Sequence, residues 1–458
     1  MYHLFFDCKT DLFESASQKL DFLFDCTKRE PERFAKFQDG FILYPCHFVW
    51  LNRKGKIFMK FLLDYIRYVL AWRKWRRKAH EKRGPGLKIG NLPELFRHLD
   101  EVGVRYVVLR WPEELPRSLE AEKTYVGDVD FLLDSDDLQK FCRAVTRFPG
   151  QVKTDSYTEN GKMGTGFGGR LSYLMPWMAE GVLERRQLWD NFCYVPSPED
   201  ALMTLVYHFT YQKGLLSGLD TGLDGVHNEL ENRHSPEKAM RKLASAVGET
   251  LPEQMTLWSL HGWLVEHGWS MPYDLLCRWS PAKRNGWHDQ LQKRLEKDLR
   301  ESLHGCTNLL VFFLRAEAVK AGLEDEMTQE LASRFRILER VELSAEARER
   351  VCRHTRGGNW GTARFHQLEE PVVALVCKDE HPQTMEGVDP KLAAKHRVEN
   401  ANVFFKQQLR EQLLQRHPDV HSNFLHGSDN DLESAEYLAA LYGPDFQDAI
   451  QRLHEMMK

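Results

Sequence analysis

Apolar and polar residues follow two patterns along the chain, and each pattern predicts a different kind of element. Short apolar runs at residues 106–109, 309–314 and 371–377 lie between polar or glycine positions, which predicts buried strands. Segments with apolar residues three or four positions apart separate these runs and predict amphipathic helices. With 458 residues, the chain exceeds the size of one hydrophobic core. The fold class that we predict is therefore α+β, with several domains.

Changes in this pattern divide the chain into four parts. We predict an N-terminal region at residues 1–85, a mixed-sheet domain at 86–220, a helical connector at 221–302 and a C-terminal domain at 303–458. The first boundary coincides with a Gly-Pro-Gly sequence, which breaks a helix. In the C-terminal part, strands and helices alternate in a β-α-β-α-β order, which is typical of a ferredoxin-like antiparallel sheet.

The N-terminal region is predicted to hold two strands about a turn at residues 52–55, followed by a long helix at residues 58–83. The first half of this helix is apolar at helical spacing, and its second half is rich in Lys and Arg, with Trp72 and Trp75 between them. Such a charge run favours a helix that packs between domains and has a solvated basic end. The alternative is a helix that binds an anionic membrane surface or nucleic acid.

Composition narrows the class of protein further. The formal net charge of −4 gives no overall attraction to nucleic acid. No apolar run approaches the ~20 residues that a membrane-spanning helix needs, and the first residues lack the basic start of an export signal. The nine cysteines include no Cys-x-x-Cys pair, which indicates reduced thiols. We therefore expect a cytoplasmic protein.

A pair of carboxylates lies on the second predicted strand of the mixed-sheet domain, in the sequence GDVDFLLDSDDL. Asp128 and Asp130 are separated by one residue, so both side chains point to the same face of a strand. Two carboxylates in this arrangement can hold Mg²⁺, with nucleotide phosphates completing its ligands. The alternative is a purely structural pair.

Residues 88–220 resemble a nucleotidyltransferase-like family of bacterial proteins, through YVVLRWPEELP, GDVDFLLDSDDL and YVPSPEDALMTLVYHFTYQKG. The resemblance implies Mg²⁺ at Asp128 and Asp130 and transfer of a nucleotidyl group onto RNA, protein or a sugar phosphate. Arg110 begins the Arg-Trp-Pro sequence at the place of the family's glycine-serine pair, and Ser172 lies where a third carboxylate is expected. We predict a mobile hairpin at residues 161–169.

The same family has residues similar to His208 and Lys213, which fall in HFTYQKG at a predicted helix end. A structural and a catalytic role are equally compatible with this position.

The sequence NFLHGSDNDLESAE, at residues 423–436, brings a histidine to a junction between a strand and a helix. Gly427 allows a ligand to approach the backbone closely, and Ser428 and Asp429 are predicted to cap the new helix. The N-terminus of that helix favours an anion such as phosphate. His426 therefore suggests phosphotransfer, and the alternative is a capped turn with a surface histidine.

Residues 303–458 resemble the nucleoside diphosphate kinase family, through the histidine segment, the strand PVVALV and the order of the intervening elements. The resemblance implies that His426 is phosphorylated. It implies nucleotide-binding roles for the residues at matching positions, which are Arg315, Trp360, Arg410, Asn423 and Ser428.

Tyr437 stands where the family has a glutamate that orients the histidine, and Asp429 lies in the adjoining turn. A carboxylate fixes the tautomer of an imidazole, whereas a hydroxyl only forms a hydrogen bond. The resemblance also implies Mg²⁺ as cofactor, nucleoside triphosphates and diphosphates as ligands, and a homo-oligomer.

The leading hypothesis is an enzyme that moves a γ-phosphate from a nucleoside triphosphate to His426 and then to a diphosphate. One alternative is a nucleotide sensor or scaffold with impaired catalysis. Another is a nucleotidyltransferase that acts through the central domain.

Overall fold

The computed structural model divides the chain into two compact units, Met1–Ala71 and Trp72–Lys458. The residues that the structure describes are 41–43, 46–48, 87–161, 173–223, 228, 230, 232, 234–279, 284–355, 360, 370–388 and 398–458. The predicted helix at residues 58–83 lies outside them, as does the predicted hairpin beyond residue 161.

In the first unit, strand β1 (Phe41–Leu43) pairs with β2 (Cys46–Phe48) in an antiparallel register that places Leu43 opposite Cys46. The predicted turn at residues 52–55 lies outside the described residues.

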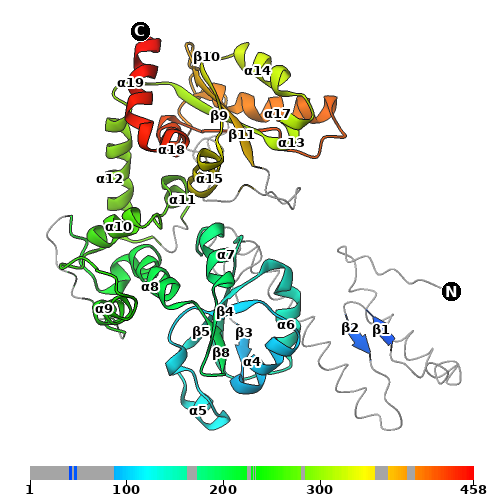
Figure 1. Cartoon of the computed structure of the whole chain (residues 1–458), viewed down its shortest axis with the longest axis vertical. Coiled ribbons are helices and arrows are strands. Elements are labelled where there is room, and N and C mark those ends of the chain that lie inside the picture. Colours follow the sequence, from blue (N-terminus) through cyan, green and yellow to red (C-terminus); the bar gives the residue numbers. More distant parts are fainter. Residues whose placement is uncertain are drawn as a thin grey trace, which may run out of the picture. The chain divides into compact units, whose positions relative to one another are not determined.

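The second unit contains a four-stranded sheet with the order β3-β6-β5-β4 (Figure 1). Its strands are β3 (Leu87–Ile89), β4 (Tyr106–Val108), β5 (Asp128–Leu133) and β6 (Val152–Thr158). Strands β5 and β6 are parallel, and the other neighbours are antiparallel, so the sheet is mixed as predicted.

Both faces of this sheet are covered. On one face, Tyr106 and Phe131 contact the rings of Phe96 and Phe141, which belong to α4 (Leu92–Glu101) and α6 (Leu138–Thr146). On the other face, Val107 and Leu132 join a core with α7 (Pro176–Glu184) and α8 (Pro198–Tyr207). Because strand residues alternate between faces, Asp128 and Asp130 lie on the α8 side with Leu132.

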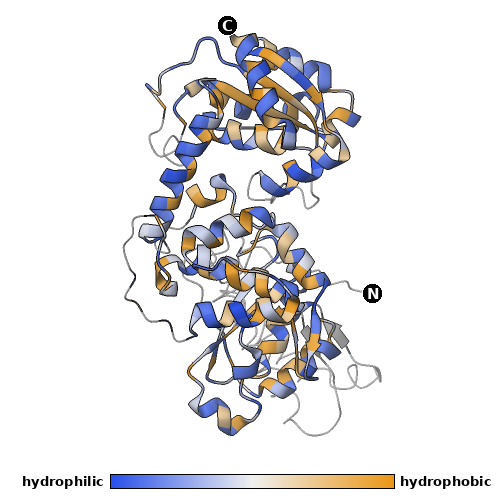
Figure 2. Cartoon of the chain, turned by 60° about the vertical axis from the view of Figure 1, so that its left-hand side comes forward, coloured by the Kyte–Doolittle hydropathy of each residue, from blue (hydrophilic) through white to orange (hydrophobic). Residues whose placement is uncertain are grey.

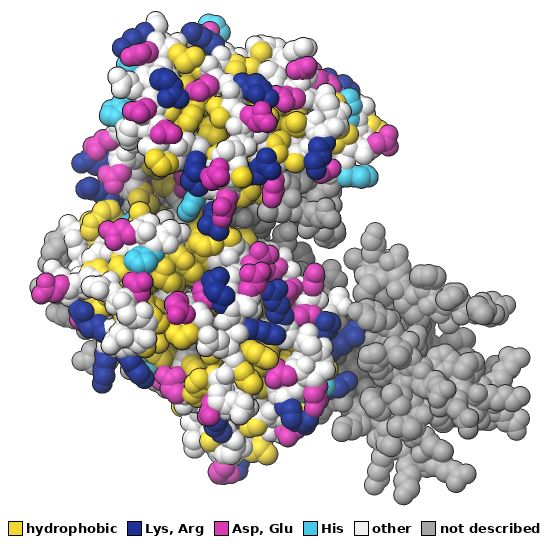
Figure 3. All heavy atoms as spheres, viewed as in Figure 1, with side chains coloured by type: hydrophobic (Ala, Val, Ile, Leu, Met, Phe, Trp, Pro, Cys, Tyr) yellow, Lys and Arg dark blue, Asp and Glu magenta, His cyan; other side chains and the backbone are white. Residues whose placement is uncertain are grey.

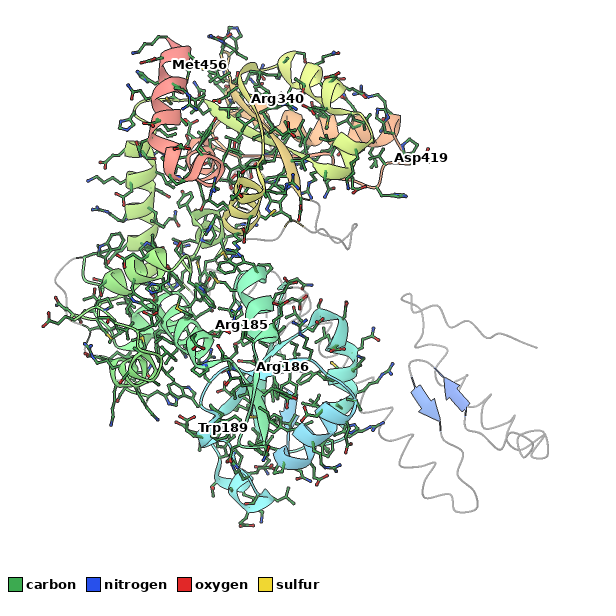
Figure 4. The ribbon with its side chains drawn as sticks, in the orientation of Figure 1. Arg185, Arg186, Trp189, Arg340, Asp419 and Met456 are labelled. Carbon is green, nitrogen blue, oxygen red and sulfur yellow. The ribbon has the colours of Figure 1, made fainter. Side chains whose placement is uncertain are left out.

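A small antiparallel hairpin, β7 (Gln187–Trp189) and β8 (Cys193–Val195), lies beside β4. Arg186 precedes it, and its guanidinium donates to the carbonyl of Tyr106 at 3.1 Å and lies 4.1 Å from the ring centre of Tyr194. Figure 4 labels Arg186 and its neighbour Arg185, which forms an ion pair of 2.7 Å with Asp200 at the start of α8. Arg186 therefore attaches the hairpin to the sheet, and Arg185 joins the end of α7 to α8.

The predicted connector is helical and shares its core with the central sheet. Its helices are α9 (Pro236–Val247), α10 (Leu257–Glu266), α11 (Tyr273–Cys277) and α12 (Gly286–Ser302), and they follow the π-helix η4 (His208–Lys213) and the 3-10 helix η5 (Gly214–Ser217) that end the preceding part. Trp263, Trp269, Trp279 and Trp287 are buried in the core that also contains Leu132 of β5. The tryptophans of this segment therefore pack the interior.

The C-terminal sheet has the order β10-β11-β9-β12, with antiparallel neighbours throughout. Its strands are β9 (Leu309–Arg315), β10 (Arg336–Glu342), β11 (Pro371–Lys378) and β12 (Leu425–Gly427). The apolar runs predicted at 309–314 and 371–377 are thus confirmed as strands. Figure 2 shows hydrophobic residues along these strands and both polar and hydrophobic residues on the surrounding helices.

Every residue of β9 is buried, because helices cover both faces of the strand. Leu309, Val311 and Phe313 face a core with α15 (Ala345–His354), α18 (Asp431–Tyr442) and α19 (Phe446–Met457). The residues between them face a second core with α13 (Ala316–Lys320), α14 (Glu324–Ala332) and α17 (Phe405–Arg416). An ion pair of Arg340 with Glu324, at 2.6 Å, also ties β10 to α14 (Figure 4).

Within the described residues, none of the helices combines the length and the apolar character required to cross a bilayer. Figure 3 shows Lys and Arg side chains interspersed with Asp and Glu over the visible face of the described residues.

Candidate functional site

His426 lies in the middle of β12, where its backbone pairs with Phe313 of β9. The strand begins just after Phe424, whose φ of 60° is a left-handed conformation that is uncommon for a bulky residue. Gly427 follows His426, and a Cβ built on it would lie 2.6 Å from Cδ1 of Phe312, so glycine is required here for close packing. The histidine is thus held at a fixed position on the edge strand of the sheet.

The imidazole of His426 is half-buried and surrounded by aromatic rings. Its Nε2 lies 2.8 Å from the hydroxyl oxygen of Tyr437, which comes from α18. The ring of Trp360 meets the imidazole edge-on, with centroids 5.5 Å apart. Because Nε2 is engaged by Tyr437, any nucleophilic attack by this histidine is assigned to Nδ1.

Tyr437→Phe should slow phosphorylation of His426 about ten-fold, because it removes the hydroxyl that holds Nε2 but keeps the ring that packs on Phe313. The measurement is the rate of phosphoenzyme formation from γ-labelled ATP. Tyr442→Phe is the matched control, since the hydroxyl of Tyr442 on the same helix bonds to Glu339 instead. Equal rates for the Tyr437 variant and the unaltered chain would show that the contact has no role.

Arg315 and Trp360 lie close to this histidine but below the surface. Arg315 has 1% of its surface exposed, and its guanidinium donates to the carbonyl of Trp360 at 2.9 Å and lies 5.2 Å from the indole ring centre. Trp360 is completely buried. In this conformation, a base cannot stack on Trp360, so the role carried over from the family resemblance needs correction. Trp360 instead packs between Arg315 and His426.

Ser428 is also turned inward. Its hydroxyl accepts the N–H of Val311 at 3.0 Å and lies 2.8 Å from the hydroxyl of Ser434. Ser434 in turn donates to the carbonyl of Leu309 at 2.6 Å. The predicted contact of Ser428 with a nucleotide therefore gives way to a structural role, in which Ser428 joins the turn after His426 to β9.

Two predicted nucleotide-binding residues keep exposed surface beside the histidine. Arg410 on α17 is half-buried, and its Nε donates to the carbonyl of Leu425 at 2.8 Å, directly before His426 in the strand. Asn423 is half-buried two residues before Leu425. Contact of either side chain with a nucleotide stays a prediction.

The helix after the turn is capped by a different residue from those predicted. Helix α18 begins at Asp431, and the side chain of Asn430 accepts the N–H of Glu433 at 2.9 Å. Asp429 instead pairs with Lys406 and gives its own N–H to Glu433 at 2.7 Å. The prediction that Ser428 and Asp429 cap the helix was wrong, because both are already bonded to neighbouring elements.

Lys406 is a residue of this site that the sequence analysis missed. It lies on α17 with 4% of its surface exposed, and its ammonium contacts the carbonyls of Gly427 and Ser428 as well as Asp429. Burial lowers the pKa of Lys406, and Asp429 opposes that effect. Its spacing of four residues from Arg410 places both cations on one helix face, which was the only signal in the sequence.

Glu433 adds an acidic group behind the turn. Burial, together with the carboxylates of Asp429 and Asp274, raises the pKa of Glu433 to about 8. The folded chain therefore keeps a proton on Glu433 up to a higher pH than the unfolded chain, in which the pKa of this group is the ordinary 4.5. The stabilising contribution is complete below pH 4.5 and is lost as the pH rises to about 8.

Glu433→Gln should therefore flatten the fall in stability between pH 5 and 8, because glutamine stays neutral at every pH. We expect the variant to be more stable than the unaltered chain by ~1–2 kcal/mol at pH 8 and similar to it at pH 5. Thermal unfolding at the two pH values measures this difference. Glu411→Gln, at an exposed position on α17, is the control. A difference that is the same at both pH values would contradict the protonation of Glu433.

Helix α18 also connects this site to the connector. The carboxylate of Glu436, directly before Tyr437, accepts the backbone N–H groups of Tyr273 at 2.6 Å and Asp274 at 3.3 Å. Burial raises the pKa of Glu436 well above its usual range. The helix that carries the partner of His426 is thus bonded on its other side to α11.

A second candidate site lies on the central sheet. Asp128, Asp130 and Asp155 offer carboxylate oxygens that all lie within 4.8 Å of one another. Asp155 was missed by the sequence analysis, although its strand has the alternating pattern of VKTDSYT. It comes from β6, whose register places it opposite Asp130, and not from the position of Ser172, which lies outside the described residues.

Asp130 is also part of a buried polar network. Its Oδ2 accepts a hydrogen bond from Nη2 of Arg110 at 2.5 Å, and its Oδ1 accepts one from the hydroxyl of Tyr157 at 3.3 Å. Arg110 also donates to the hydroxyl of Tyr173, which lies 2.6 Å from Nδ1 of His208 on the π-helix η4. His208 is therefore linked to the carboxylates through Tyr173 and Arg110, and a π-helix is frequent at functional sites.

These three carboxylates fit a divalent cation, because Mg²⁺ prefers hard oxygen ligands. Asp128 as a residue is exposed, but partial desolvation of its carboxyl group, together with the negative charge of Asp130, raises its pKa. Arg110 and Lys213 act in the opposite direction, so Lys213 lies near enough to affect this group. The site therefore has surplus negative charge on its exposed side and a fixed cation, Arg110, on its buried side.

The chain matches no family model, and comparisons with curated proteins and with solved structures found no match either.

Proposed function

We propose that the C-terminal part of the chain is a nucleotide-handling phosphotransferase of the nucleoside diphosphate kinase type, with His426 as the group that becomes phosphorylated. The observation that carries the proposal is the contact of 2.8 Å between Nε2 of His426 and the hydroxyl of Tyr437. The strand order β10-β11-β9-β12 supports it, because this order with antiparallel neighbours is ferredoxin-like, as the family resemblance implies.

In the proposed reaction, Nδ1 of His426 attacks the γ-phosphorus of a nucleoside triphosphate. An N–P bond forms, the bond between the γ-phosphorus and the β,γ-bridging oxygen breaks, and the diphosphate leaves with that oxygen. A second diphosphate takes the phosphoryl group in the reverse direction. Mg²⁺ carried by the nucleotide would offset the charge of the phosphates.

The residues of the chain would divide the remaining work between them. Nε2 keeps its proton and donates a hydrogen bond to the hydroxyl oxygen of Tyr437 when Nδ1 reacts, so the phenol supports the positive charge that forms on the imidazole. Arg410, which is bonded to the carbonyl of Leu425, would bind phosphate oxygens beside the histidine.

Incubation of the full chain with γ-labelled ATP and Mg²⁺ tests the proposal. We expect a labelled protein whose label is lost in acid and retained in alkali, as for phosphohistidine, and is removed by added nucleoside diphosphate. Absence of label when nucleotide binding is retained would contradict the proposal and would favour a nucleotide sensor or scaffold.

A second candidate function is metal-dependent nucleotidyl transfer at the central sheet, and Asp155 is the observation that favours it. Asp155 supplies the third carboxylate that this chemistry uses, on the strand beside Asp128 and Asp130. When bound, Mg²⁺ would polarise the α-phosphate of a nucleotide.

Release of pyrophosphate from a nucleoside triphosphate, in the presence of RNA, protein or sugar phosphate acceptors, tests this second function. Asp128→Asn and Asp155→Asn should each abolish the release. Release that persists unchanged in both variants would exclude the carboxylates as its source.

A further inference from the structure

We propose that Lys406 is a positioning residue for His426, and that its buried charge keeps the imidazole neutral and ready to react. This inference rests on the proposed phosphotransfer. It concerns a residue that neither the sequence pattern nor the family resemblance assigns to the site.

The first observation is the geometry of the ammonium group. A lysine ammonium has three N–H donors, and three oxygens surround this one. Two are the consecutive carbonyls of Gly427 and Ser428, each at 2.7 Å, and the third belongs to Asp429. Because its donors already have acceptors in the turn, Lys406 holds the backbone that follows His426 rather than a phosphate.

The second observation is how closely the lysine stem approaches the strand. Cδ of Lys406 lies 3.4 Å from the position that a Cβ on Gly427 would occupy. The glycine that follows His426 therefore accommodates both Phe312 on one side and the stem of Lys406. The ammonium then reaches the carbonyls of Gly427 and Ser428, which follow the histidine.

The third observation is the set of charges around the turn. The ammonium is paired with Asp429, whose side chain is 18% exposed, and the carboxylate of Glu433 and the guanidinium of Arg410 also act on it. Among the described residues, Tyr437 of α18 contacts the imidazole, Arg410 of α17 donates to the carbonyl directly before His426, and Arg315 of β9 lies over Trp360, which packs on the imidazole. The ammonium of Lys406 bonds to the carbonyl of Gly427, the residue directly after His426, so its charge lies close to the backbone that carries the imidazole.

Two consequences follow from this position. A fixed backbone holds Nδ1 in the direction of attack, and misplacement of a reacting group by about 1 Å lowers a rate about a hundred-fold. A nearby buried cation also disfavours protonation of an imidazole, so more of His426 is in the neutral, nucleophilic form at a given pH.

Lys406→Met and Lys406→Arg separate these effects from simple loss of structure. We expect Lys406→Met to slow phosphoenzyme formation about ten- to a hundred-fold, mainly in kcat, with little change in KM for ATP. The arginine variant keeps the charge and should restore most of the rate. The pH profile of the rate of the methionine variant should shift to higher pH, because His426 then holds its proton to higher pH.

A double variant, Lys406→Met with Asp429→Asn, addresses the case in which the single variant fails to fold. It removes both charges together, so no unpaired carboxylate is left in the turn. The double variant should fold and still show the slower rate, whereas its pH profile should lie close to that of the unaltered chain, because a cation and its paired anion are removed together. An unchanged rate and pH profile in a folded methionine variant would overturn the proposal.

NMR titration of ¹⁵N-labelled histidine gives a readout that needs no phosphorylation. The pKa of His426 should be higher in Lys406→Met than in the unaltered chain and unchanged in Lys406→Arg. If the unaltered chain takes no label, the phosphotransfer proposal fails, but this titration still decides the role of Lys406. An equal pKa of His426 in all three proteins would overturn that role.

Discussion

Replacing His426 by glutamine should abolish acid-labile phosphorylation of the chain and leave its fold intact. Glutamine has no nucleophilic nitrogen, but its amide can still contact the hydroxyl of Tyr437. The backbone pairing of residue 426 with Phe313 does not depend on the side chain, so β12 should remain in the sheet. The expected loss is therefore one of chemistry and not of structure.

The measurement is the amount of label retained after incubation with γ-labelled ATP, together with the thermal unfolding of each protein. His421→Gln is the matched control, since His421 is exposed five residues earlier in the chain. The control should be labelled as the unaltered chain is. Label of equal amount in His426→Gln would place the phosphorylated residue elsewhere.

Replacing Asp130 by asparagine should destabilise the central part of the chain by about 3–5 kcal/mol, because the buried guanidinium of Arg110 loses its charged partner. The two side chains are 6% and 12% exposed and are joined at 2.5 Å. Asparagine keeps the shape of aspartate and removes only the charge. The change therefore measures what an unpaired buried cation costs in this position.

Asp128→Asn is the control, because it makes the same chemical change two residues earlier on the same strand, at an exposed position. We expect less than about 0.5 kcal/mol for this variant. Denaturation in urea, followed by fluorescence, compares the two. A double variant, Arg110→Met with Asp130→Leu, should recover much of the stability, since replacing a whole buried ion pair by apolar residues is often neutral. Equal effects of Asp130→Asn and Asp128→Asn would contradict this interpretation of the ion pair.

The strands that the sequence predicts well are those whose pattern has a single physical meaning. The continuous apolar run at residues 309–314 predicts a strand covered on both faces, and β9 is buried at every position. The alternation around Asp128 and Asp130 likewise predicts a strand, and β5 contains both residues. The local pattern is sufficient to predict these strands because the apolar side chains that enter the core belong to the strand itself.

The parts of the sites that the sequence did not predict depend on contacts between distant segments. Asp155 joins Asp130 only through the parallel register of β5 and β6. Lys406 reaches the turn after His426 from a separate helix, across 21 residues of sequence. The position of Trp360 below the surface likewise depends on its packing against Phe313 and His426. The spacing of residues along the chain does not indicate these contacts.

Identification of the nitrogen of His426 that carries the phosphoryl group tests the proposed phosphotransfer most directly. Because Tyr437 holds Nε2 at 2.8 Å, the phosphorus should be bonded to Nδ1. The labelled chain can be digested at alkaline pH, where phosphohistidine is stable. ³¹P NMR and mass spectrometry of the phosphopeptide then identify the residue and the nitrogen. We predict one phosphopeptide, which contains His426 phosphorylated at Nδ1. A phosphoryl group on Nε2 of His426, or on any other residue, would contradict the account.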